Sequence, residues 1–218
     1  METPTLPMHE QLLLLVLDEE GTTRSSYADR ALAGAMLLDL LRSGVAHADR
    51  DQVTVASRPS PAAGVLADAA RVIADESRAR GPRWWVDQLP RRMQPFLPRV
   101  ADRLVGSGVL TEQSHRVLGL FPTTRLPARQ TAPGAEVRER LRAVLLGERP
   151  PEPDDAILAG LIAALDLVGA IVDRSQVKEA KRRARELGDS VVGDAVGQAI
   201  KSAEDAVTAA VIAATTAA

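Results

Sequence analysis

Arginine and tryptophan side chains gather in one stretch of this 218-residue chain. Residues 78–103 hold both tryptophans, Trp84 and Trp85, and only two acids, Asp87 and Asp102. The seven arginines of the stretch are Arg78, Arg80, Arg83, Arg91, Arg92, Arg99 and Arg103. Guanidinium groups bind phosphate in a fork geometry, and tryptophan rings favour the headgroup level of a membrane. The stretch therefore favours an anionic lipid surface as ligand. The alternative is that Trp85 is a core residue and the arginines are a solvated face.

Residues that could carry out catalysis are scarce. The three histidines, His9, His47 and His115, lie far apart, and no pair has the i, i+4 spacing of a helical metal site. The sequence has no cysteine, no G-x-S-x-G, no P-loop and no strand followed by G-x-G-x-x-G. Asp154 and Asp155 are adjacent and are better placed to start a helix than to share a proton. We expect no enzymatic activity, no metal and no cofactor.

Composition and charge place the chain among folded cytoplasmic proteins. It is 45% hydrophobic and 26% charged, and its aromatic content of 2% leaves a core of aliphatic residues that suits helix packing. The net charge of −2 gives no overall attraction to nucleic acid. No apolar run approaches the ~20 residues of a membrane span, and no signal peptide is recognisable. We expect a cytoplasmic protein, peripheral on the inner face of the cell membrane where it binds lipid.

The apolar pattern predicts a mainly α fold, with one helical domain at 12–214 and short β-hairpins packed around a central apolar helix. Residues 1–11 are expected to be flexible because they contain prolines, and the run 12–17 fits either a short strand or a helix. Hairpins are expected near 45–56 and 109–121. The stretch 156–172 lacks a polar face and is expected to be the helix buried on all sides. A final amphipathic helix is expected at 191–213.

One local pattern occurs twice. A helix ends at Ser43-Gly44 and a hairpin follows, and the same order recurs at Ser107-Gly108. Glycine at such a position ends a helix by taking the left-handed conformation. We interpret the likeness as a local motif used twice.

An ordered series of segments carries a family resemblance along nearly the whole chain. These segments are Ala31–Leu40, Trp85–Leu89, Arg103–Glu112, Asp155–Ala159 and Ala180–Leu187. Their order resembles the Golgi phosphoprotein 3 family, and the chain looks like a bacterial homologue. The resemblance implies a single helical domain with small hairpins that binds phosphatidylinositol 4-phosphate at a basic pocket. It also implies peripheral attachment to membranes and, in eukaryotes, adaptor work in Golgi sorting.

The resemblance also points to positions for the headgroup pocket. The family's tryptophan falls near Arg24 and its first arginine on Ala33. Its later arginine pair falls on Gln94 and Leu97, or on Pro98 and Ala101, depending on the gap. Arg99 and Arg103 lie one turn apart nearby. Together with the basic stretch, this gives the following candidate headgroup-binding residues: Arg24, Trp84, Trp85, Arg91, Arg92, Arg99 and Arg103.

Three functions remain open from the sequence. The first is binding of anionic lipid headgroups by a peripheral membrane protein. The second is a cytosolic scaffold or regulator that acts through protein contacts after losing lipid binding. The third is a winged-helix-like nucleic-acid binder, which ranks well below the other two. A helix that reads DNA is usually strongly basic, whereas the helix before the first hairpin is nearly all apolar, so no nucleic acid is expected as a partner.

Overall fold

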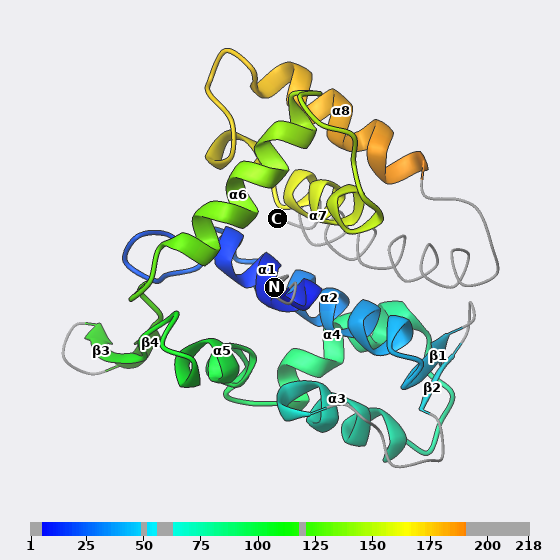
Figure 1. Cartoon of the computed structure of the whole chain (residues 1–218). Helices are drawn as coiled ribbons and strands as arrows, with labels where there is room; N and C mark the ends of the chain where they lie inside the picture. The colour runs from blue at the N-terminus through cyan, green and yellow to red at the C-terminus, as the bar shows by residue number, and fades with distance from the viewer. Residues whose placement is uncertain (1–5, 49–51, 56–62, 118–120, 191–218) are drawn as a thin grey trace.

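The computed structural model describes residues 6–48, 52–55, 63–117 and 121–190 (Figure 1). The helices are α1 (Met8–Val16), α2 (Ala28–Arg42), α3 (Gly64–Ala74), α4 (Pro82–Arg92), α5 (Phe96–Gly106), α6 (Ala132–Leu145), α7 (Pro153–Ala164) and α8 (Val177–Ser190), with a 3-10 turn η1 (Val168–Ala170). Two antiparallel hairpins pair β1 (Ala46–Ala48) with β2 (Val53–Val55) and β3 (Gln113–Val117) with β4 (Phe121–Arg125). The predicted mainly α fold with two short hairpins is confirmed. The second hairpin spans 113–125 and not the predicted 109–121, because the amides of Val109 and Leu110 bond back to the carbonyl of Leu104 in α5.

Helix α1 occupies the centre of the fold. All nine of its residues are buried, and it packs against α2, α5, α6 and α7. Figure 1 shows it between the α6–α8 group and the α3–α5 group. The run 12–17, which fitted either strand or helix, therefore belongs to a helix that ends where Leu17 becomes extended.

The start of α1 differs from the sequence expectation. Residues 8–11 were expected in a flexible segment, but they form the first turn of α1 and are buried. Pro7 precedes the helix without capping it, and the caps come instead from Asp39 of α2. Because this cap lies about 30 residues away in sequence, no local signal marks the helix start. The expected helix at 191–213 lies outside the described residues.

The sequence predicted one helix, buried on all sides, over the apolar stretch 156–172, and this prediction is wrong. Helix α7 ends at Ala164, Asp166 takes a left-handed conformation with φ 57°, and η1 follows. The Asp166 side chain is exposed and pairs with Lys181 of α8. Seven residues of α7 are buried, but the central apolar helix is α1.

The repeated motif predicted from the sequence is present in both places with the same backbone contacts. After α2, Gly44 has φ 68° and the amide of Val45 donates to the carbonyl of Leu40. After α5, Gly108 has φ 75° and the amide of Val109 donates to the carbonyl of Leu104. In each case the preceding serine hydroxyl bonds a carbonyl of the last helical turn. The Ser-Gly stop thus directs each helix into its hairpin.

Candidate anion-binding surface

The two adjacent tryptophans of helix α4 differ in how far they are buried. Pro82 begins the helix, where its missing N–H is of no consequence. Trp85 lies on the face that packs against α2 and is 1% exposed, whereas Trp84 is only half-buried. The two rings meet edge to face, with centroids 4.8 Å apart and planes at 86°. Trp85 is therefore a core residue, and Trp84 is the tryptophan available at the surface.

Two arginines lie against the Trp84 ring. The guanidinium carbon of Arg80 is 4.5 Å from the ring centroid and that of Arg92 is 4.9 Å away. Both distances fall within the range of a cation–π interaction. Arg92 comes from the last turn of α4, and Arg80 from the segment just before the helix. The ring therefore holds in one place two cations that are twelve residues apart in sequence.

A carboxylate joins the same arginines. Glu76, which follows α3, accepts a hydrogen bond from Arg92 at 2.8 Å and lies 3.9 Å from Nε of Arg80. The backbone amide of Arg78 also donates to it, at 3.3 Å. Burial by itself raises the pKa of Glu76, but the Arg78 hydrogen bond and the charges of Arg92 and Arg80 outweigh burial and lower that pKa. Glu76 is thus ionised at neutral pH.

The exposed face of α4 carries further positive charge. Arg83, Trp84, Asp87 and Arg91 fall on one face at 3.6 residues per turn. Asp87 is already paired with Arg30 of α2 at 2.6 Å. Arg83 and Arg91 are exposed and form no ion pair with any residue that the structure describes. We call Arg80, Arg83, Trp84, Arg91 and Arg92 the Trp84 surface.

The remaining predicted site residues lie elsewhere. Arg99 of α5 pairs with Asp68 of α3 at 2.6 Å. Arg103 of α5 makes two hydrogen bonds with Glu10 of α1. Arg24 follows α1, and its Nε donates to the carbonyl of Leu17. The structure thus brings together Trp84, Trp85, Arg91 and Arg92 on α4, while Arg99, Arg103 and Arg24 are each engaged in contacts within the fold.

Sequence reasoning missed Glu76, and it placed Arg80 in the basic stretch without including it among the candidate headgroup-binding residues. The charge count began at residue 78 and so left out Glu76 by two positions. The spacing of Glu76 and Arg80 resembles a helical i, i+4 pair, but α3 ends at Ala74 and no helix joins them. Glu76, Arg80 and Arg92 come together only in the folded protein, where Arg92 hydrogen-bonds Glu76 and lies over the same Trp84 ring as Arg80.

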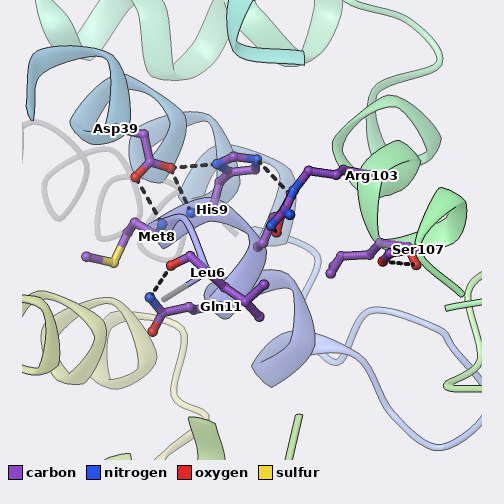
Figure 2. A network of polar contacts seen from close by, with 9 residues as sticks. Leu6, Met8, His9, Gln11, Asp39, Arg103 and Ser107 are labelled. Carbon is purple, nitrogen blue, oxygen red and sulfur yellow. Dashed lines mark hydrogen bonds and ion pairs between the residues drawn. The ribbon is translucent and has the colours of Figure 1, made fainter. Parts of the chain in front are cut away.

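A second polar cluster lies inside the molecule, at the start of α1 (Figure 2). The Asp39 carboxylate accepts hydrogen bonds from the backbone amides of Met8 and His9, at 3.0 Å each, and lies 2.6 Å from Nδ1 of His9. Nε2 of His9 lies 4.0 Å from Glu10, which in turn holds Arg103. His9 and Glu10 are almost fully buried. These groups satisfy one another, and the cluster fixes α1 against α2 and α5.

Comparison with known proteins finds one family whose model matches this chain. The model of a family described as Golgi phosphoprotein 3 matches residues 8–207. No curated protein matches the chain. In the part of the chain that the structure describes, no helix combines the length and apolar character required to cross a bilayer.

Proposed function

Because the chain belongs to the Golgi phosphoprotein 3 family, we propose that it is a non-enzymatic protein of the cytoplasm that binds anionic, phosphoinositide-like lipid headgroups at the inner face of the membrane. The Trp84 surface is the proposed contact. The observation that carries the proposal is a half-buried tryptophan in contact with two arginines, beside two exposed arginines that lack an ion pair among the described residues.

The charge of this surface supports electrostatic attachment. Four arginines and Glu76 give it a net charge of +3, since Asp87 is neutralised by Arg30. Each basic residue near an anionic leaflet contributes about 1 kcal/mol, and the attraction fades over a Debye length. The ring of Trp84 adds an apolar contact that salt does not screen. Binding should therefore fall as salt rises while leaving a residual dependence on Trp84.

Vesicle sedimentation tests the proposal. Wild-type protein should bind vesicles that contain phosphatidylinositol 4-phosphate or another anionic lipid and should ignore pure phosphatidylcholine. The double substitution Arg83→Ala/Arg91→Ala removes two unpaired charges, worth about 2 kcal/mol or about 30-fold in affinity. The matched control is Arg129→Ala/Arg185→Ala, which removes two exposed arginines elsewhere and changes the net charge equally.

The alternatives make different predictions in the same assay. If the control pair weakens binding as much as the α4 pair, attraction is not local to the Trp84 surface. If the wild type ignores anionic vesicles, a scaffold that acts through protein contacts becomes the better proposal. A winged-helix role fits the structure poorly, because α2, the helix before β1, has ten buried residues and offers no basic face.

A further inference from the structure

Glu76 occupies the place where an anionic ligand would meet the Trp84 surface. Its side chain is 11% exposed, and its two oxygens face Arg92, the Arg78 amide and Arg80. The two guanidinium groups nearest to Glu76, those of Arg80 and Arg92, are also the two that lie over the Trp84 ring. The protein thus already presents one carboxylate to the pair of guanidinium groups best positioned to grip an anion.

The carboxylate leaves one donor of this site unused. Nε of Arg80 is buried and has no hydrogen-bond partner among the described residues, because the nearest Glu76 oxygen is 3.9 Å away. An unpaired buried N–H is costly, and native proteins rarely keep one without a reason. A carboxylate has two oxygens and one charge, whereas a phosphomonoester has three terminal oxygens and nearly two charges at neutral pH. The donors of Arg80 and Arg92 therefore suit a phosphomonoester better than the resident carboxylate.

We infer that Glu76 is the resident anion of a phosphomonoester site formed by Arg80, Trp84 and Arg92, and that a ligand must displace Glu76 to bind. The inference rests on the proposed function and adds a selection rule to it. A phosphodiester headgroup carries one charge, like Glu76, and gains little by replacing it. A phosphomonoester headgroup carries more charge and more acceptors, so it can replace the carboxylate. Glu76 thus sets the minimum strength with which an anion must bind the two arginines in order to occupy the site.

The test compares two neutralising substitutions that change the net charge equally. Glu76→Gln removes the resident anion, and Asp68→Asn removes the carboxylate of α3 that pairs with Arg71 and Arg99. Each variant is measured against phosphatidylcholine vesicles that contain either phosphatidic acid, a phosphomonoester, or phosphatidylglycerol, a phosphodiester, at matched surface charge. Glu76→Gln should raise affinity for phosphatidic acid vesicles about tenfold, the size of one charge-assisted hydrogen bond, because the phosphomonoester no longer has to displace the carboxylate. The gain on phosphatidylglycerol vesicles should be no larger, because a phosphodiester that binds wild type without displacing Glu76 gains less from its removal. Asp68→Asn should raise both equally and weakly.

A soluble arm separates this inference from membrane binding. Both tryptophans of the protein lie at the site, so intrinsic fluorescence during titration with inorganic phosphate reports on it alone. Glu76→Gln should bind inorganic phosphate about tenfold more tightly than wild type and Asp68→Asn should match wild type. This result with no vesicle binding would keep the site and reject the membrane role.

Two results would overturn the inference. One is an equal gain for Glu76→Gln and Asp68→Asn on both kinds of vesicle, which would mean that only long-range charge matters. The other is vesicle binding by wild type with no change in affinity for phosphatidic acid or inorganic phosphate in Glu76→Gln, which would leave the membrane role standing without the site. Glu76→Ala, which lacks the amide that could still fill the site, should repeat the gain, and thermal denaturation checks that both variants are folded.

Discussion

The ion pair between Glu10 and Arg103 joins a buried side chain to an exposed one, so its two members should differ in how well the protein tolerates their loss. Glu10 is 1% exposed and Arg103 is 59% exposed. Replacing Arg103 with Ala strands the Glu10 carboxylate inside the protein, with Nε2 of His9 still 4.0 Å away. Replacing Glu10 with Gln frees an arginine that can turn into water.

The magnitudes follow from that difference in burial. Stranding a buried charge costs about 3–5 kcal/mol, and the exposure of Arg103, which lets water reach Glu10 after truncation, reduces this to about 2–3 kcal/mol. Glu10→Gln keeps an acceptor oxygen and should cost about 1 kcal/mol. For a chain of this size the melting temperature should fall by about 4–12 °C for Arg103→Ala and about 2–4 °C for Glu10→Gln.

Urea and thermal unfolding of the two single variants and of the double variant test this reasoning. Adding Glu10→Gln to Arg103→Ala should restore part of the lost stability, because the stranded charge disappears. Arg182→Ala, whose partners Glu179 and Glu186 are exposed, is the control and should cost less than about 0.5 kcal/mol. A double variant less stable than Arg103→Ala alone would refute the account of a stranded buried charge.

Three further predictions concern the helix cap, a tight turn and pH. Asp39→Ala removes the acceptor of the Met8 and His9 amides and should lower the free energy of unfolding by about 2–4 kcal/mol in urea titrations; Asp39→Asn, which keeps one acceptor, should lose less. Gly21→Ala would place Cβ 2.1 Å from the backbone nitrogen of Pro127, so it should prevent normal folding as judged by circular dichroism. Gly44→Ala, with a similar φ and open space, should cost only about 1–2 kcal/mol. The pKa of Glu76 is lowered in the folded protein, so its stabilising contribution is present above the unfolded pKa of about 4.3 and is lost as the pH falls through the folded value. The unfolding free energies of wild type and Glu76→Gln should therefore converge at acid pH. A difference that stays constant down to acid pH would contradict the ion pairs described.

The parts of the fold that sequence predicted well are those set by neighbouring residues. The two Ser-Gly stops depend on backbone contacts within six residues, and the hairpins after them pair residues no further apart than Gln113 and Arg125, so the local pattern indicates both. The start of α1 depends on Asp39, and the break at Asp166 depends on a left-handed residue inside an apolar run. Neither leaves a local signal, so residues 8–11 were predicted as flexible and the stretch 156–172 was predicted as one helix.

The candidate site shows the same limit for charges. Counting charges within residues 78–103 identified a basic stretch, but the carboxylates that neutralise it come from α1, α3 and the segment after α3. Glu10, Asp68 and Glu76 take up Arg103, Arg99 and Arg92. The sequence therefore identified a basic stretch around Trp84 without separating the arginines that hold the fold together from those left exposed.

Helix α1 has a consequence for how the chain could be divided. It has nine residues, fewer than the ~12–15 that an isolated helix needs in water, so it persists only while both of its walls are present. One wall comes from α2 and α5 and the other from α6 and α7. The loop between the walls is exposed at 128–131. A chain cut there would yield two fragments that remain unfolded apart and regain structure together, so the protein should be suited to fragment complementation.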